Sequence, residues 1–503
     1  MIRSTLLGCV LLVAVPAAAL PASATEPGAV ELVRRSTVEL ESDPARALRT
    51  SEQALRLDAA VKGGQLARAR ALVALRRFGD AAAAFRLALA LDPKNRDIIF
   101  DLSRAERRAG HPERAVVLLD PLLAAGDDTD VRFERAIALT MAGQPDKALA
   151  DYDRLISAEP TAGMYYNRGW IIYERKDFAK ALADFERAHA LDPKDVDTLA
   201  ALGSTLLMMD RNEESLARYT AALAIAPGNT DALSGGADAN YNLGRWQAAV
   251  GGYRAARKIL AKRADLALWE GRALVRAGDR KGALAAYDAA IRIDPRSSET
   301  FQSRAKLYEA SGDRKKALAD YGRAIAADST NAEFLVDRAS LYRDMDRAAE
   351  ARRDLDAAIG IDAKSSYAFS VLGLLLTDAE DYAGAITAYD RALAIEPERE
   401  ATYHNRGDAY VALGRHDRAI RDYNQSLARS PGDPVTLNAK GEAYRLIDDE
   451  LRAIEEFTAA IDADPDLALA YLRRSLAREA IGDKAGAEAD HARAVQLEPA
   501  YAD

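Results

Sequence analysis

The chain repeats itself along its length, and this constrains its fold more than any other feature. A short end-mark of the form Leu-Asp-Pro returns every 34 residues, or at multiples of that spacing, in the later part of the chain. Its prolines are Pro160, Pro193, Pro227, Pro295, Pro397, Pro431, Pro465 and Pro499, with Pro93 earlier. In this phase residues 28–501 divide into fourteen units, two of them 33 residues long. A repeat of this length predicts a solenoid rather than one globular core.

Each unit carries small and aromatic residues at fixed places. The twentieth residue is alanine in thirteen of the fourteen units, the eighth is Gly, Ala or Ser in all but the first, and the twenty-fourth is aromatic in ten. Turn pairs such as Gly278-Asp279 and Gly312-Asp313 divide a unit into two helical stretches. We expect two antiparallel helices per unit, closest at the eighth and twentieth residues, with the twenty-fourth ring filling the space between one pair and the next.

These positions resemble the tetratricopeptide repeat, and the resemblance covers essentially everything after the first 24 residues. It implies an all-α fold, a right-handed superhelical solenoid of about fourteen helix-turn-helix repeats with a concave groove. It also implies a non-enzymatic scaffold that binds a peptide or a partner protein in that groove.

The N-terminus has the composition of a secretory signal peptide. An apolar run ends at Ala22-Ser23-Ala24, which fits the small-residue rule for cleavage after Ala24. We expect residues 1–24 to be removed and residues 25–503 to form one continuous solenoid. The protein would then be exported, most naturally to a bacterial periplasm. No later segment of the sequence is apolar over the length that a membrane span needs.

Composition narrows the classes of function. The net charge of −9 argues against nucleic acid as a partner. Cys9 is the only cysteine and lies in the predicted signal peptide, so we expect no disulfide and no cysteine metal site. The sequence has none of the common catalytic motifs, and its five histidines are scattered. We therefore expect no enzyme, no cofactor and no metal. A buried acidic pair in the groove with strongly shifted pKa values would indicate an enzyme instead.

Acidic residues recur at the second position of the units. They are Asp97, Asp130, Asp197, Asp231, Asp265, Glu299 and Glu333. We expect each to lie in the first turn of its helix, where a negative charge offsets the helix dipole. This role explains them without catalysis.

Aromatic residues gather in one unit, between residues 165 and 178. In the tetratricopeptide family, positions 2, 5, 6, 9, 12 and 13 of the first helix share one face and line the groove. The groove residues of this unit would be Tyr166, Asn167, Trp170 and Tyr173, and neighbouring units add Phe100, Phe133, Met141 and Met208. Tyr165, Phe178 and Phe185 would instead pack between helices. The resemblance gives Asn167 the role of hydrogen-bonding a bound peptide backbone. Two interpretations stay open: the groove rings bind a ligand, or they pack on each other across a narrow groove.

Basic residues also fall on groove positions. One set, near the aromatic residues, is Arg70, Arg104, Arg107 and Arg108; a second set is Arg272, Arg276, Lys306 and Arg343. They are either binding residues or solvated surface charge. Rings beside arginines would suit an extended segment with apolar side chains and a carboxylate or acidic stretch.

Two functions follow from these predictions. The first is an exported scaffold that binds a protein or peptide in its groove. The alternative is a periplasmic component of an exopolysaccharide export or envelope-assembly system, which binds polymer or a separate barrel partner. The fold alone does not decide between them.

Overall fold

A computed structural model of the chain describes residues 27–502. These residues form 28 α-helices and one 3-10 helix, and no strand occurs among them. The fold is the predicted all-α repeat of fourteen helical pairs. The predicted signal peptide, residues 1–24, lies outside the described residues and stays a prediction.

The chain divides into two compact units, Met1–Ala239 and Asn240–Asp503, with the division inside one helix. In the first unit the helices are α1 (Pro27–Glu39), α2 (Pro44–Leu57), α3 (Gly64–Ala74), α4 (Phe78–Leu91), α5 (Arg96–Arg108), α6 (Pro112–Ala125), α7 (Thr129–Met141), α8 (Pro145–Ala158), α9 (Ala162–Glu174), α10 (Phe178–Leu191), α11 (Val196–Met208) and α12 (Asn212–Ile225). The helix that contains the division is α13 (Thr230–Asn242). The second unit continues with α14 (Trp246–Ile259), α15 (Ala264–Arg276), α16 (Arg280–Ile293), α17 (Ser298–Ala310), α18 (Arg314–Ala327), α19 (Ala332–Arg343), α20 (Ala348–Ile361), α21 (Ser366–Asp378), α22 (Tyr382–Ile395), α23 (Glu400–Ala412), α24 (His416–Arg429), α25 (Pro434–Arg445), α26 (Glu450–Ala463), α27 (Ala468–Ala480), α28 (Lys484–Leu497) and the 3-10 helix η1 (Pro499–Ala502).

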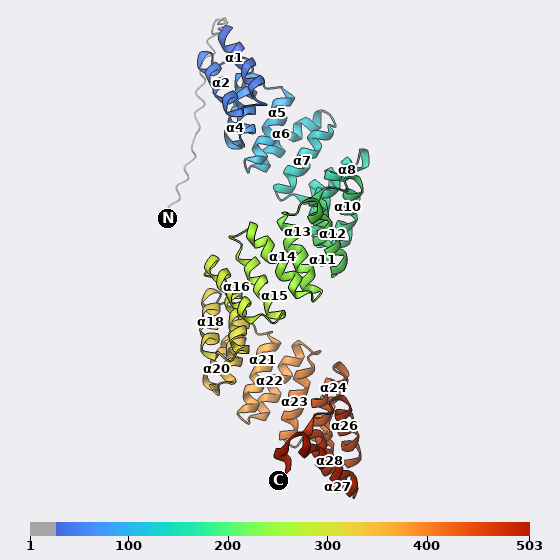
Figure 1. Ribbon diagram of the computed structural model, residues 1–503. Coiled ribbons are helices and arrows are strands. Elements are labelled where there is room, and N and C mark those ends of the chain that lie inside the picture. The colour runs from blue at the N-terminus through green and yellow to red at the C-terminus, as the bar shows by residue number, and fades with distance from the viewer. Residues whose placement is uncertain (1–26, 503) are drawn as a thin grey trace, which may run out of the picture. The chain divides into compact units, whose positions relative to one another are not determined.

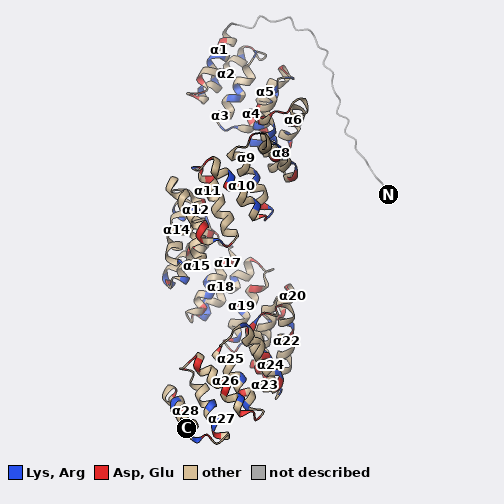
Figure 2. Cartoon of the chain, turned by 90° about the vertical axis from the view of Figure 1, so that its right-hand side faces the viewer, with Lys and Arg blue, Asp and Glu red and all other residues tan. Residues whose placement is uncertain are grey.

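Inside each of the two compact units, helices that are neighbours in the chain pack on each other. The first helix of a pair packs on the second, as α9 does on α10, and the second packs on the first helix of the next pair, as α10 does on α11 (Figure 1). First helices of successive pairs also touch, for example α7 and α9. Acidic and basic residues are interspersed over the helices of both units (Figure 2). The core is therefore a series of small layers rather than one centre.

The turns and first-turn charges are as predicted. Gly278 and Gly312 have φ of 82° and 77°, a left-handed conformation that glycine adopts without strain. Asp279 and Asp313, which follow them, accept the hydrogen bonds that cap α16 and α18. All seven second-position acids lie in the first turn of their helices.

The small and aromatic positions pack as expected. All ten rings at the twenty-fourth position are at most 2% exposed. Ser215, which replaces alanine at the twentieth position, donates a hydrogen bond to the carbonyl of Gly203 at 2.7 Å, which shows how closely these two positions approach. A β-carbon on Gly203 would lie 2.8 Å from the ring of Tyr219, and one on Gly235 of the next pair would lie 2.2 Å from it. The ring therefore fills the space inside its own pair and against the next.

A second repeated contact was not predicted. In six hairpins of the described chain, the arginine at the seventh position pairs with an aspartate sixteen residues later, on the second helix. The pairs are Arg135–Asp151, Arg168–Asp184, Arg304–Asp320, Arg338–Asp354, Arg406–Asp422 and Arg474–Asp490. Each uses two hydrogen bonds; in Arg168–Asp184 they are 2.8 and 2.6 Å long. All six aspartates are buried. The pair links the two helices of one hairpin.

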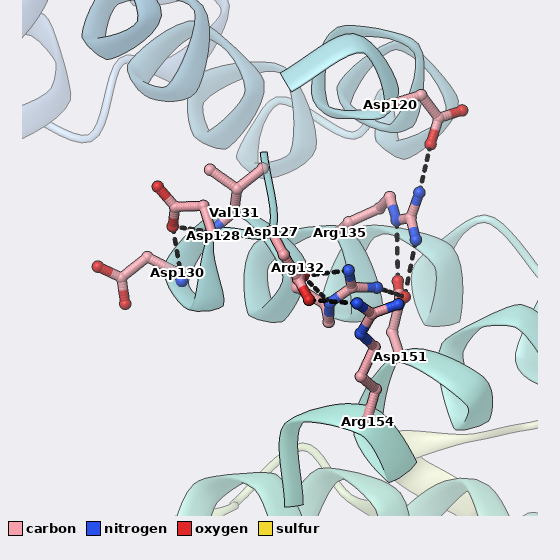
Figure 3. A network of polar contacts seen from close by, with 9 residues as sticks. All are labelled: Asp120, Asp127, Asp128, Asp130, Val131, Arg132, Arg135, Asp151 and Arg154. Carbon is pink, nitrogen blue, oxygen red and sulfur yellow. Dashed lines mark hydrogen bonds and ion pairs between the residues drawn. The ribbon is translucent and has the colours of Figure 1, made fainter. Parts of the chain in front are cut away.

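The network around α7 shows this pair in its surroundings (Figure 3). Arg135 donates to both oxygens of Asp151 at 2.8 and 2.7 Å, and to Asp120 on α6 at 2.9 Å. Arg132 also donates to Asp151 at 2.9 Å and pairs with Asp127 before α7. The buried Asp151 is thus held by two guanidinium groups, which offset the cost of burying its charge.

Candidate functional site

Groove positions of three successive first helices surround one hollow in the first unit. We call it the aromatic hollow; its volume is about 350 Å³. Its lining from α9, α11 and α13 is Tyr166, Trp170, Tyr173, Asp197, Ala200, Ala201, Ser204, Leu207, Met208, Asp231, Ser234, Gly235 and Asp238, with Tyr219 of α12 as its floor. Every lining residue from the first helices occupies one of the six expected groove positions.

The groove rings are packed against one another. Trp170 lies edge-to-face with Tyr166 and Tyr173, at centroid distances of 6.2 and 5.0 Å. Tyr166 and Trp170 also contact the buried ring of Phe185, at 5.9 and 5.5 Å. Phe178 joins the row through Tyr173 at 5.2 Å. The three groove rings are half-buried, so they stabilise the hairpin and still line the hollow. The two interpretations left open by the sequence are therefore compatible.

The rim of the aromatic hollow is acidic. Asp197, Asp231 and Asp238 contribute to its lining, and no Lys or Arg does. Asp197 and Asp231 are exposed, and no ion pair joins either of them to another described residue. Both aspartates lie at the second position of their repeat, where we expected their charge to offset the helix dipole. This position also lies on the groove face, so the signal for this rim was present in the sequence.

The acidic rim acts on the neighbouring phenol. Burial raises the pKa of Tyr166, the negative charges of Asp197 and Asp231 raise it further, and a hydrogen bond with Trp170 opposes them. Burial also raises the pKa of Tyr173. Both tyrosines are neutral at physiological pH.

Of the groove residues predicted in neighbouring repeats, Phe100 and Phe133 lie outside the aromatic hollow, as does Asn167, and Met208 lines it. Phe133 packs edge-to-face on the buried ring of Tyr152 at 6.1 Å, and the side chain of Asn167 interacts with the Tyr152 hydroxyl. Phe100 packs on the core between α6 and α7. Met208 lines the hollow and is 53% exposed.

Three of the four arginines of the first set line a separate space, the arginine hollow, of about 370 Å³. Its lining is Leu40, Arg70, Val73, Ala74, Phe78, Phe85, Asp101, Arg104, Ala105 and Arg108. Arg70 pairs with Asp101 at 3.5 Å, and Arg108 lies over the ring of Phe78 at 5.5 Å without an ion pair to any residue the structure describes. The two hollows share no lining residue, so rings and arginines do not form one patch.

Arg107 belongs to neither hollow. It donates to Glu134 on α7, with one bond of 3.2 Å, and Arg104 lies 3.8 Å from the same carboxylate. Glu134 is only 5% exposed. Arg107 is thus tied to a buried partner on the next pair and is a structural residue here.

Three of the four residues of the second basic set pair with carboxylates of following helices. The contacts are Arg272–Glu299 at 3.2 Å, Lys306–Asp337 at 3.0 Å and Arg343–Asp378 at 3.0 Å. Arg276 instead stacks on Trp246, at 4.8 Å, and Arg272 also stacks on Trp269, at 4.6 Å. The four residues are spread along α15 to α19 and form no shared hollow.

Two groove carboxylates in the second unit are buried enough to have perturbed pKa values. Burial raises the pKa of Asp337 and of Glu309. Asp337 accepts hydrogen bonds from Gln302 at 2.7 Å and Lys306, and Glu309 accepts one from the hydroxyl of Tyr321 at 2.6 Å. Each carboxylate is therefore engaged in a network that joins neighbouring helices.

Among residues 27–502, no cluster of His, Cys, Asp and Glu could hold a metal ion. No helix in that range has both the length and the apolar character needed to cross a bilayer.

The hairpins and their repeated positions define a helical-repeat protein. Family models described as tetratricopeptide repeat match residues 72–139, 142–196 and 401–433, and one described as TPR repeat matches residues 373–414. These segments of the chain are tetratricopeptide repeats.

Solved structures similar to this chain include other repeat proteins. The APC/C hetero-tetramer Cut9-Hcn1 is 16% identical, with 89% of this chain and 95% of that chain covered and a TM-score of 0.44. A tetratricopeptide repeat protein from Parabacteroides merdae is 21% identical, with 49% and 98% covered and a TM-score of 0.41. PilF of Pseudomonas aeruginosa is 20% identical, with 40% and 92% covered and a TM-score of 0.37. No curated protein matches the sequence. At these scores the likenesses say nothing about what this chain binds.

Proposed function

We propose that this protein is a non-enzymatic scaffold that holds a segment of a partner protein in the groove of its first unit. The observation that carries the proposal is the aromatic hollow, where groove positions of α9, α11 and α13 converge. Tetratricopeptide repeats build scaffolds for protein–protein interaction, and half-buried Trp and Tyr rings are typical anchors of such contacts. The raised pKa values of Asp337 and Glu309 do not favour catalysis, because both carboxylates are occupied by structural hydrogen bonds.

The place of action is part of the proposal. The predicted signal peptide favours export to a periplasm. The alternative function, in polysaccharide export or envelope assembly, draws on the same hollow, because Trp and Tyr rings beside carboxylates also suit sugar rings. The nature of the captured partner distinguishes the two.

A photo-crosslinking experiment tests the proposal. A photoreactive amino acid replaces Met208, which lines the aromatic hollow, or Met141, which is equally exposed at 54% but lines neither hollow. We expect a specific protein adduct from position 208 in the cells that make this protein, and none from position 141. The adduct should be lost when Tyr166, Trp170 and Tyr173 are all replaced by leucine, which keeps apolar packing against Phe185.

The outcomes are distinct. An equal adduct from both positions, or an adduct that survives the leucine replacements in a folded variant, overturns groove binding. A polysaccharide in the adduct supports the alternative.

A further inference from the structure

We propose that the aromatic hollow receives a lysine or arginine side chain from an extended segment of the partner protein. The inference rests on the proposed function and adds the chemistry of the ligand. It reverses the expectation from the sequence, in which rings beside arginines suited an acidic segment.

The first argument is the stacking pattern of the three tryptophans. Trp246 and Trp269 are each covered by an arginine of this chain, at 4.8 and 4.6 Å. No Lys or Arg among the described residues stacks on Trp170, nor on Tyr166 or Tyr173. The other two tryptophans are thus stacked by arginines of this chain, whereas Trp170 is not. A cation above an indole face is attracted by the ring, more strongly when water is excluded.

The second argument is charge. The hollow is lined by Asp197, Asp231 and Asp238 and by no cationic side chain. Asp197 and Asp231 have no ion pair within the described chain, so their charges are available to an incoming cation. The raised pKa of Tyr166, to which both charges contribute, is consistent with a negative potential over the rings.

The third argument is the shape of the ligand. Leu207 and Met208 on α11 provide an apolar wall beside the rings. The aliphatic stem of Lys or Arg packs on such a wall while the charged end reaches the carboxylates. A glutamate side chain would meet the carboxylates of Asp197 and Asp231, which is repulsive. A neutral apolar side chain would leave the rim charges unused.

Peptide pools test the inference on the full chain. Fluorescently labelled octapeptide pools carry arginine, citrulline or glutamate at one fixed central position and random residues elsewhere; citrulline has nearly the shape of arginine without its charge. Fluorescence anisotropy measures binding at low and high salt. We expect the arginine pool to bind roughly tenfold more tightly than the citrulline pool at low salt, with a smaller ratio at high salt.

Matched variants locate the effect. In Asp197→Asn with Asp231→Asn, we expect the arginine-to-citrulline ratio to fall below about threefold. The control is Asp97→Asn with Asp130→Asn, which changes two exposed first-turn acids that line neither hollow. Because both variants alter the same helix position, any general effect on stability should be the same, and only the first should lose the preference.

The remaining outcomes separate this inference from the proposed function. If the citrulline pool binds as tightly as the arginine pool while the adduct at Met208 forms, the inference fails and groove binding stands. If the preference survives the change of Asp197 and Asp231, the cation is bound elsewhere and the inference fails. If no pool binds and no adduct forms at Met208, both fail.

Discussion

The arginine hollow and the aromatic hollow are lined from the same positions of the repeat, but the charged residues of the first are mainly arginines and those of the second are aspartates. Each has a twenty-fourth-position ring in its lining, Phe85 in one and Tyr219 in the other. At the ninth position the first hollow carries arginines, whereas the second carries Trp170, Ser204 and Asp238. The repeat thus sets where a side chain points, and the residue at that place sets what the surface attracts.

The largest effect is expected at Glu134, which lies between the residues of the two hollows in the sequence. Replacement of Glu134 by alanine should lower the free energy of unfolding by about 3 kcal/mol, because it leaves the half-buried Arg107 without its carboxylate. Urea unfolding would measure this. The control is Glu174→Ala, at an exposed position without an ion pair in the described chain, which should change stability by less than about 0.5 kcal/mol. Equal effects of the two changes would contradict the structural role of Glu134.

Two glycine-to-alanine substitutions test how tightly Tyr219 is packed at the floor of the aromatic hollow. In Gly235→Ala the new β-carbon would meet the ring of Tyr219, so we expect a loss of about 1–3 kcal/mol. Gly79→Ala in α4 meets no atom within 4 Å and should instead stabilise by up to about 1 kcal/mol, because alanine favours helix over glycine. Thermal unfolding of both variants would show opposite shifts. A neutral Gly235→Ala would mean that the ring can move aside.

The arginine hollow offers a charge test with little effect on stability. Arg108 contacts the ring of Phe78 and has no ion pair in the described chain, so Arg108→Ala should cost less than about 1 kcal/mol. It should weaken binding of the glutamate-centred pool severalfold and leave the arginine-centred pool unchanged. Arg49→Ala on α2, at an exposed site outside both hollows, serves as the control. Loss of both pools would show that the hollows are not independent.

The smallest expected effect is on alkaline stability. The folded protein keeps Tyr166 neutral more strongly than the unfolded chain does, because its pKa is raised. As pH rises above the ordinary tyrosine value of about 10, the unfolded chain loses this proton first, so stability should fall. In Asp197→Asn with Asp231→Asn the pKa of Tyr166 should move down, toward its ordinary value. Phenolate absorbance, with Tyr166→Phe as the reference, measures the shift. An upward shift would contradict the acidic rim.

The repeat phase predicted the helices, their turns and the groove face, because these follow from periodicity and from where small residues must lie. Gly203 and Gly235, for example, are small because Tyr219 leaves no room for a side chain. The same phase placed Asp197 and Asp231 on the groove, although the helix dipole alone explained them. The sequence therefore contained both the residues of the aromatic hollow and its acidic charges, but because the helix dipole explained those charges, no cation site was predicted.

The ion pairs that neutralise the basic groove residues were harder to predict. Arg107 and Glu134 are 27 residues apart on different pairs, as are Arg272 and Glu299. Which arginine reaches which carboxylate of the next pair depends on the rotation between successive pairs and on side-chain rotamers. The arginine–aspartate pairs inside the hairpins, in contrast, recur at fixed positions of the repeat. The ring contacts of Phe178 were also only partly predicted. We expected it to pack between helices, and it also contacts Tyr173 and so extends the row of groove rings.

The arginine–aspartate pair inside a hairpin has a consequence for how such a chain can change its length. Both members of Arg304–Asp320 lie in one 34-residue repeat, so a duplication or deletion of that repeat carries the cation and the anion together. The buried aspartate of this pair is therefore not orphaned by the event, whereas contacts between repeats, such as Lys306–Asp337, must form again with the new neighbour. A repeat that carries both members of the pair can thus be gained or lost without a compensating substitution for that aspartate.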